Sequence, residues 1–312
     1  GQSYFQCVEE NLSYEQICLE NQRETEWDKQ RFDVLEEQTV ETSAAVKQEE
    51  VKKQEDVRVE KLKKTKDSGY LLQNFYIVDS TTSVTKKQFQ VEKLLGANMK
   101  LVKEPGKKQV LIYHTHAASE GFADSTKKES DSVIGVGDEL TKALEKKGYG
   151  VIHDRTKYDL VQGRLDRSLA YNQALASVEK ILQKNPSIQV VIDLHRDSVG
   201  KGKHTYTTIN GKKCAIVMFF NGMSRSKNGP IPYLYNENLT DNLAFSLQLK
   251  CLAMERYPGF TKPIYLKGYR YNLHLRKRSL LIELGNENNT VEEAKNAASP
   301  LAEVIAGVLA GN

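Results

Sequence analysis

Residues 188–198 read IQVVIDLHRDS, and this stretch decides the predicted fold. The segment from Ile188 to Leu194 is a short, largely apolar run, which is typical of a buried β-strand. His195 stands at its end, within the segment Asp193-Leu194-His195-Arg196-Asp197. A buried strand must be covered on both faces, so we expect a layered domain around it.

The surrounding chain alternates between similar apolar runs and amphipathic helical patterns. Further strands are predicted over 74–78, 110–113, 150–153, 215–220 and 279–284. Helices are predicted around Val133, Val136, Leu140 and Leu144, which recur at helical spacing, and over 166–184, 237–256 and 291–310. This alternation predicts an α/β fold, a three-layer αβα domain whose central sheet is mostly parallel or mixed.

The first 70 residues differ in composition from the rest. They are acidic overall, whereas the remainder is basic and gives the whole chain a net charge of +4. Residues 5–66 are rich in Glu, Gln and Lys and contain no Pro or Gly, which favours helix. Because 44–66 has few large apolar residues, we expect a solvated helix, an arm or a flexible stalk there. We therefore divide the chain into a charged helical N-terminal region, 1–70, and a catalytic domain, 71–312.

Composition excludes several classes of protein. No apolar run reaches the roughly 18 residues that a membrane-spanning helix needs. The four cysteines form no CxxC pair, so a thiolate zinc knuckle is not expected. We expect free thiols, with a local bridge between Cys7 and Cys18 as the alternative. The basic body favours a polyanionic partner, but no nucleic-acid recognition motif accompanies it, so we expect no nucleic-acid partner.

Histidine and glutamate side chains follow three of the predicted strands. His114 and His116 come directly after the strand 110–113, and Glu120 lies four residues further on. His195 ends the strand quoted above, and Glu283 lies near the end of the last strand. Because ligands bind at the carboxyl ends of strands in α/β sheets, we expect these side chains to share one site.

Two histidines, a carboxylate ligand and a separate glutamate match the side chains of a catalytic zinc site. In this hypothesis His116, Glu120 and His195 bind Zn²⁺, and Glu283 is the general base for a metal-activated water. The neighbours of Glu283 predict burial, and ionised carboxylates are rarely buried unless they are paired or bound to a metal.

Several assignments around this site stay open. A histidine at a strand end is often only a hydrogen-bonding residue. His114 and His116 are two residues apart, so in a strand they would face the same side and either could reach the metal. Glu129 could replace Glu120 as the carboxylate ligand. Arg196 could contact the substrate or support the ligands.

Two further segments carry weaker signals. Aromatic and basic residues interleave over 269–278 and could bind an anionic polymer, although a solvated strand edge explains the same pattern. Gly135 and Gly137 form a G-x-G within a predicted helix, where we expect no phosphate site.

Five blocks of the chain carry a resemblance to a known family. They are FYIVDSTTSVTKKQFQVEKLL (75–95), VLIYHTHAASEGF (110–122), VGDELTKALEKKGYGVIHD (136–154), VVIDLHRDS (190–198) and LLIELGNENNTVEEA (280–294). In this order they resemble the stage II sporulation protein P family, the peptidoglycan hydrolases of engulfment in spore-forming bacteria. The resemblance runs from about residue 70 to the C-terminus.

The resemblance implies the fold of the zinc-dependent N-acetylmuramoyl-L-alanine amidases. It implies cleavage of the amide between N-acetylmuramic acid and L-alanine, together with endopeptidase action on cross-links. By motif it assigns the zinc ligands to His116, Glu120 and His195 and the catalytic carboxylate to Glu283. It also implies peptidoglycan and stage II sporulation proteins D and M as partners. The expected location is the extracytoplasmic face of the membrane, through an N-terminal anchor that lies outside this sequence.

Two other functions fit the residues. A carboxypeptidase-like zinc peptidase can use the same ligands and base, with an arginine to hold the terminal carboxylate of its substrate. A non-catalytic scaffold would bind peptidoglycan and use its acidic N-terminal helices to recruit partners.

Overall fold

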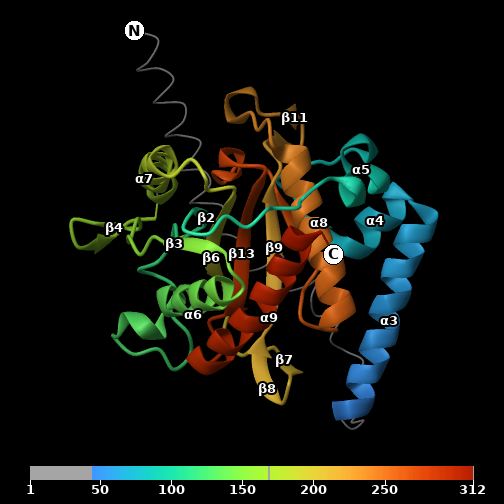
Figure 1. Cartoon of the computed structure of the whole chain (residues 1–312), viewed down its shortest axis with the longest axis horizontal. Coiled ribbons are helices and arrows are strands. Elements are labelled where there is room, and N and C mark those ends of the chain that lie inside the picture. Colours follow the sequence, from blue (N-terminus) through green and yellow to red (C-terminus); the bar gives the residue numbers. More distant parts are fainter. Residues whose placement is uncertain (1–43, 168, 312) are drawn as a thin grey trace.

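The computed structural model describes residues 44–167 and 169–311, which include a seven-stranded sheet in the order β1-β12-β9-β13-β6-β2-β3 (Figure 1). Helices lie on both faces of this sheet, so the three-layer α/β prediction is confirmed. The strands are β1 (Tyr76–Val78), β2 (Lys108–Tyr113), β3 (Gly150–His153), β6 (Val190–Asp197), β9 (Val217–Gly222), β12 (Ile264–Lys267) and β13 (Arg278–Asn286).

The sheet is mixed and consists of two parallel halves. Strands β13, β6, β2 and β3 run parallel to one another, and so do β9, β12 and β1. The halves meet at β13 and β9, which are antiparallel. The carboxyl ends of β2, β6 and β13 therefore lie together at one edge of the sheet.

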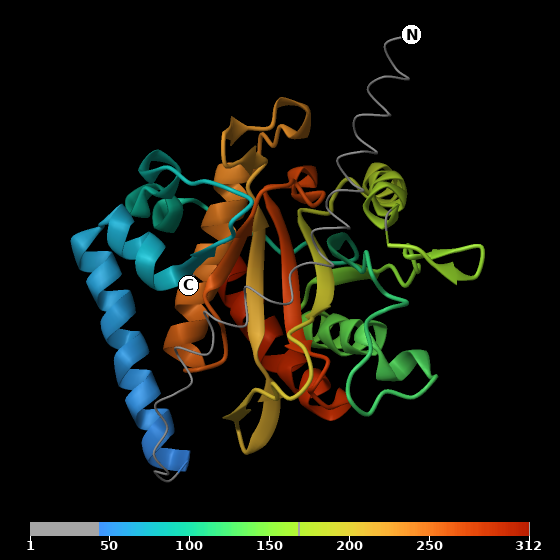
Figure 2. The same ribbon diagram turned by 180° about the vertical axis from the view of Figure 1, so that it is seen from behind.

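The helices cover the two faces unequally. One face packs against α4 (Ser68–Phe75), α5 (Val91–Gly96), α6 (Val133–Lys146), α8 (Leu239–Arg256) and α9 (Val291–Ala310). The other face packs against α7 (Ala170–Lys184), seen from behind in Figure 2. The side chains of β6 alternate between these layers: Val190 and Ile192 point to the first core and Val191 to the α7 core.

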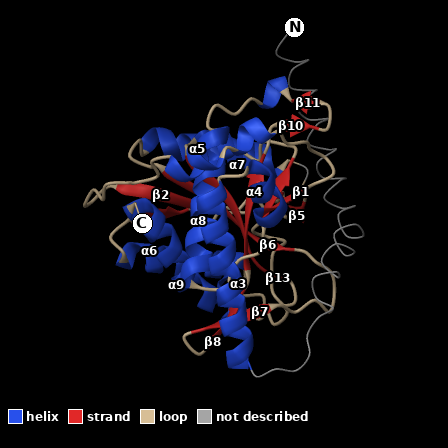
Figure 3. Cartoon of the chain, turned by 90° about the vertical axis from the view of Figure 1, so that its right-hand side faces the viewer, coloured by secondary structure: helices blue, strands red, loops and turns tan. Residues whose placement is uncertain are grey.

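Helix α3 (Ala44–Thr65) confirms the expected helix but does not stand clear of the domain. It lies against α8, with Val59 and Leu62 fully buried, and Figure 3 shows it in front of α8. Lys63 forms an ion pair of 2.6 Å with Glu255 at the end of α8. Most of the other described side chains of α3 are at least partly exposed, as the prediction of a solvated helix requires, while these two apolar residues attach the helix to α8. The predictions for 5–43, including Cys7 and Cys18, lie outside the described residues.

Local sequence explains where several elements begin. Thr290 and Glu293 form a capping box at the start of α9: the Thr290 hydroxyl accepts from the Glu293 N–H at 3.1 Å, and the Glu293 carboxylate accepts from the Thr290 N–H at 3.1 Å. Asp67 likewise caps α4 by accepting from the N–H of Gly69 at 2.6 Å. Because of this cap, residues 68–75 form a helix, and the strand expected over 74–78 is reduced to Tyr76–Val78.

The remaining elements are short. Three two-stranded hairpins are formed by β4 (Leu160–Val161) with β5 (Arg164–Leu165), β7 (Tyr206–Ile209) with β8 (Lys212–Ala215), and β10 (Arg225–Ser226) with β11 (Gly229–Pro230). Single 3₁₀ turns are η1 (Lys86–Phe89), η2 (Glu129–Asp131), η3 (Pro232–Leu234) and η4 (Leu273–Leu275). Strand β12 was not expected from the sequence.

None of the described helices has the length and apolar character needed to cross a membrane.

The basic residues of the 269–278 segment include two that brace the fold. Arg276 donates to the carbonyl of Ile188 at 2.8 Å, and Arg278 donates to the carbonyls of Met99 at 3.0 Å and Lys100 at 2.8 Å. These hydrogen bonds join the start of β13 to the neighbouring loops, so the interpretation as a solvated strand edge is wrong for Arg276 and Arg278.

The two cysteines of the described residues, Cys214 and Cys251, are buried free thiols, as expected.

Candidate active site

The pairing register of the adjacent strands β13 and β6 places two of the predicted site residues, Glu283 and His195, side by side. Glu283 on β13 is the register partner of His195 on β6, and Tyr113 at the end of β2 is the partner of Asp193. Register partners on parallel strands point to the same face, and residues two apart on one strand do so as well. Asp193, His195 and Glu283 therefore share the sheet face on which α7 lies.

His195 lies between two carboxylates and is almost fully buried. Its Nδ1 atom is 3.1 Å from Oε1 of Glu120, and its Nε2 atom is 2.8 Å from Oδ1 of Asp193. Burial alone would lower the pKa of His195, but the negative charges of Asp193 and Glu120 outweigh it and hold this pKa well above its ordinary value.

Glu120 reaches His195 from the loop that follows β2. Its second carboxylate oxygen, Oε2, accepts a hydrogen bond from the backbone N–H of Arg196 at 2.9 Å. Its backbone carbonyl accepts from the N–H of Val133, the first residue of α6, at 3.1 Å. The carboxylate is thus fixed against the end of β6, with one oxygen on the backbone and one on the imidazole.

His116 comes from the same loop and has an unpaired ring nitrogen. The ring lies edge-on to His195, with centroids 5.3 Å apart, and edge-on to Tyr171 of α7, at 5.5 Å. Its Nδ1 atom is buried without a hydrogen-bond partner among the described residues. Burial, together with the positive charges of Arg167 and His195, holds the pKa of His116 well below its ordinary value. A neutral imidazole with an unpaired buried nitrogen is a suitable metal ligand.

Glu283 is half-buried beside this group, and its Oε2 atom has no hydrogen-bond partner in the described part of the chain. Burial raises the pKa of Glu283 to about 8, and the negative charges of Asp197 and Glu120 act in the same direction. His195 lowers the pKa but does not cancel these effects. A carboxyl group with a pKa near neutrality can accept and return a proton under ordinary conditions.

The two histidines of the HTH motif face apart. Strand β2 ends at Tyr113, so the chain has turned before His116 and the strand alternation no longer applies. The Nδ1 atom of His114 lies 2.7 Å from the carbonyl oxygen of Leu194, and its Nε2 atom lies 2.7 Å from Nε2 of His153. Burial and the His153 ring lower the pKa of His114 to about 3. The structure therefore places His114 behind the cluster and His116 within it.

Glu129 lies away from the cluster, and the Arg196 side chain contacts the loop that carries Glu120. Glu129 is on the surface, where it pairs with Arg155 at 2.6 Å and Lys157 at 3.2 Å. The guanidinium group of Arg196 donates to the carbonyl of Asp197 at 3.0 Å and to that of Ser119 at 3.4 Å. Arg196 thus braces the loop that carries Glu120.

Asp193 is a member of the cluster that the sequence reasoning missed. It is fully buried and accepts from the N–H of Thr115 at 2.9 Å and from its hydroxyl at 2.6 Å. It therefore ties the HTH motif to β6 while it contacts His195. Its signal was a carboxylate inside an apolar strand, the same signal that singled out Glu283.

The chemistry of this cluster fits a zinc ion, although the side chains are not arranged as a closed metal site. Among the described residues no three His, Cys, Asp or Glu side chains converge closely enough to hold a metal as they stand. The 3.1 Å between the nearest atoms of His195 and Glu120 is nonetheless close to the roughly 3.3 Å that separates two ligands about 2.0–2.1 Å from a tetrahedral zinc. His116 adds its unpaired nitrogen. A metal bound at a ring nitrogen of His195 would compete with a proton for that nitrogen, so zinc affinity would depend on pH.

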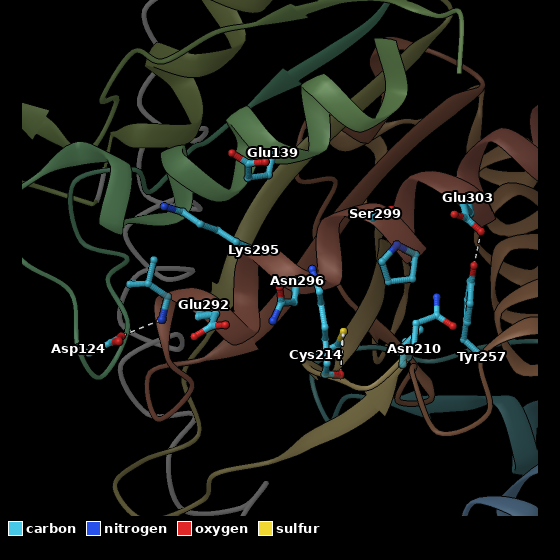
Figure 4. A pocket seen from close by; sticks show the side chains of 14 residues that line it. Asp124, Glu139, Asn210, Cys214, Tyr257, Glu292, Lys295, Asn296, Ser299 and Glu303 are labelled. Carbon is cyan, nitrogen blue, oxygen red and sulfur yellow. Dashed lines mark hydrogen bonds between the residues drawn. The ribbon is translucent and has the colours of Figure 1, made fainter. Parts of the chain in front are cut away.

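A polar groove lies on the other side of the sheet, along α9 (Figure 4). Its lining includes Glu139 of α6, Cys214 of β8 and Lys295, Asn296 and Glu303 of α9. None of the cluster residues lines it, so it is separate from the candidate site.

Fold and cluster together define an α/β domain that presents a buried group of histidines and carboxylates at the carboxyl edge of a parallel half-sheet. The sequence model of the family described as Stage II sporulation protein P (SpoIIP) matches residues 4–306. The chain belongs to the stage II sporulation protein P family.

A curated relative agrees with this assignment. Stage II sporulation protein P of Bacillus subtilis (strain 168) is 32% identical over 218 residues, which cover 64% of this chain and 50% of the relative. The match thus spans about half of that protein's length.

Solved structures with some similarity include two amidases. An N-acetylmuramoyl-L-alanine amidase from Clostridium difficile 630 is 14% identical, with a TM-score of 0.39, over 65% of this chain and 94% of that chain. The N-acetylmuramyl-L-alanine amidase Ami1 from Mycobacterium abscessus is 15% identical, with a TM-score of 0.38, over 67% and 99%.

Proposed function

We propose that this chain is a peptidoglycan hydrolase, and more specifically a zinc-dependent N-acetylmuramoyl-L-alanine amidase that acts in engulfment. The observation that supports the proposal is the 3.1 Å contact of His195 with Glu120, with the ring of His116 beside it and Glu283 as the register partner of His195. Membership of the stage II sporulation protein P family supports the same substrate class. Endopeptidase action on cross-links is part of the proposal as a second activity.

The proposed site residues have three different roles: metal binding, support of a ligand and proton transfer. His116, Glu120 and His195 would hold Zn²⁺, which when bound supplies a Lewis acid for the scissile carbonyl and lowers the pKa of water. Asp193 lies 2.8 Å from Nε2 of His195 as a charge partner without hydrogen-bond geometry, and we assign it to holding the ring whose other nitrogen faces Glu120. Glu283 takes a proton from the attacking water on Oε2, the oxygen left unpaired by the described residues, and gives it to the departing alanine nitrogen.

The surroundings suit this role for Glu283. In the absence of a cation, burial raises the pKa of Glu283 to about 8, so this carboxyl group holds a proton more firmly than an ordinary glutamate does. A divalent cation nearby lowers the pKa of a carboxyl group, so metal binding would prepare Glu283 to act as a base. Arg196 is engaged by backbone carbonyls, and we assign it to support of the Glu120 loop.

The test is a digest of purified peptidoglycan sacculi. Zinc-loaded protein, chelated protein and chelated protein with zinc restored are compared by mass spectrometry of the released material. The proposal predicts stem peptides with free N-terminal L-alanine in the first and third samples alone. Release of C-terminal amino acids from free peptides would instead support the carboxypeptidase-like peptidase. Binding to sacculi without release, with or without a glycan-cleaving protein, would support the scaffold.

Partners and location complete the proposal. We propose that stage II sporulation proteins D and M act with this chain, and that it works on the extracytoplasmic face of the membrane. Co-purification of the three proteins from membranes of sporulating cells is the direct test of this part.

A further inference from the structure

One turn carries two of the proposed ligands. His116 and Glu120 are separated by Ala117, Ala118 and Ser119, in the loop between β2 and η2. Within the turn, the N–H of Ser119 points back to the carbonyl of His116 at a long 3.2 Å. The shape of this turn sets the direction in which both ligands point, so whatever holds it controls the site.

A buried carboxylate from a different segment holds the turn. Asp159 accepts a hydrogen bond from the N–H of Ala118 on Oδ1 at 2.9 Å. On Oδ2 it accepts from the N–H of Ser119 at 3.1 Å and from the hydroxyl of Ser119 at 2.8 Å. The side chain of Asp159 is fully buried. Two consecutive backbone N–H groups around one carboxylate form a strong, charge-assisted anchor.

Asp159 is itself fixed from outside the site. It stands just before β4, at the base of the β4–β5 hairpin, and its carbonyl accepts from the N–H of Asp166 at 2.8 Å. From the other side of the turn, Arg196 donates to the carbonyl of Ser119. Ser119 is thus clamped between the connection that precedes α7 and the end of β6.

We propose that Asp159 is a positioning residue for the metal site: it fixes the 117–119 turn so that His116 and Glu120 face His195. The role of the turn as a carrier of zinc ligands rests on the proposed function. The anchoring of the turn by Asp159 does not, because it can be measured in metal-free protein.

Asp159→Asn is the test variant and Asp154→Asn its matched control. Asparagine keeps the size of the side chain but replaces one accepting oxygen by an N–H₂ group, which cannot accept from Ser119. Asp154 lies in the same connection and also binds a turn, but its partners are the N–H of Thr156 at 3.1 Å, the hydroxyl of Thr156 at 2.7 Å and the hydroxyl of Tyr158. It makes no contact with the ligand turn in these hydrogen bonds.

Two quantities are measured on each variant. The first is zinc affinity, by competition with a chromophoric chelator, where loss of an outer partner typically costs about 10–100-fold. The second is hydrogen exchange of the Ala118 and Ser119 amides in metal-free protein. We expect Asp159→Asn to weaken zinc binding about 10–100-fold and to speed exchange at both amides, while Asp154→Asn leaves both quantities unchanged.

Either of two results would overturn the inference: unchanged amide exchange in Asp159→Asn, or equal effects of the two variants. If Asp159→Asn does not fold, Ser119→Ala removes the hydroxyl bonds to Asp159 and to the His116 carbonyl but leaves both backbone N–H bonds to Asp159, and the same two quantities must then move in the same direction by a smaller factor. If the unmodified protein binds no zinc, the proposed function fails, and amide exchange alone still decides whether Asp159 anchors the turn.

Discussion

Glu283 and His195 are register partners on the adjacent parallel strands β13 and β6, and their side chains lie on the same face of the sheet. One strand thus supplies the proposed base and its neighbour a proposed ligand, with a spacing fixed by backbone hydrogen bonds. A shift of one residue in this register would turn Glu283 to the opposite face. The sheet itself therefore positions the two groups on which the proposed reaction depends.

The raised pKa of Glu283 predicts that the free energy of unfolding of the metal-free protein depends on pH. Its ordinary value is 4.5 and its value in the folded protein is about 8. Between these two pH values the folded state holds a proton that the unfolded state has lost, so the free energy of unfolding falls as pH rises. Glu283→Gln lacks this titration, so we expect its stability relative to the unmodified protein to increase from pH 5 to pH 8.

Denaturant unfolding of both proteins at several pH values checks this. Glu60→Gln, at an exposed position of α3, serves as the control, and its curve is expected to parallel that of the unmodified protein. A parallel curve for Glu283→Gln as well would show that burial does not hold the proton on this carboxyl group.

Gly137 is predicted to be needed for the packing of the two histidines behind the site. A Cβ atom at this position would lie 2.5 Å from Nε2 of His153 and 2.8 Å from Nε2 of His114. We expect Gly137→Ala to destabilise the protein by about 1–3 kcal/mol through overpacking. Gly96→Ala, also in a helix, meets no described atom within 4 Å and should be neutral or slightly stabilising. Thermal unfolding compares the two, and equal melting temperatures would refute the packing explanation.

Because α3 packs against α8, we predict that this highly charged helix contributes to the stability of the domain. Leu62 is fully buried there, whereas Val57 is 55% exposed on the same helix. Leu62→Ala should therefore cost about 2–5 kcal/mol of unfolding free energy, and Val57→Ala less than about 0.5 kcal/mol. A negligible effect of Leu62→Ala would mean that α3 moves independently of the domain in solution.

Much of the fold could be predicted from local patterns. The apolar runs that form β2, β6, β9 and β13 are long enough to leave few other interpretations, and the helices α6, α7, α8 and α9 follow helical patterns in the sequence. Strand β12 was missed because its apolar run, Ile264 to Leu266 between Pro263 and Gly268, has only three residues, although these residue types favour a strand. The antiparallel pairing of β9 with β13 could not be predicted either, because strand direction depends on pairing between distant segments.

The site was predictable where a polar residue interrupts an apolar strand. Glu283 and His195 carried that signal, and Asp193 carried it too, although its contact with His195 is visible only in the structure. The choice between His114 and His116 was not predictable, because it depends on where β2 ends. The anchoring of their loop by Asp159 depends on a contact between segments 40 residues apart. The G-x-G in α6 has a reason that only packing reveals: Gly137 makes room for His153.

The most direct test of the central claim separates metal binding from catalysis in two variants. Zinc content and release of stem peptides from sacculi are measured for the unmodified protein, Glu283→Ala and His195→Ala. We predict that Glu283→Ala keeps its zinc and loses about 10²–10⁴-fold in rate, the usual contribution of a general base, while His195→Ala loses both zinc and release. Undiminished release by Glu283→Ala, or full zinc content in His195→Ala, would contradict the account.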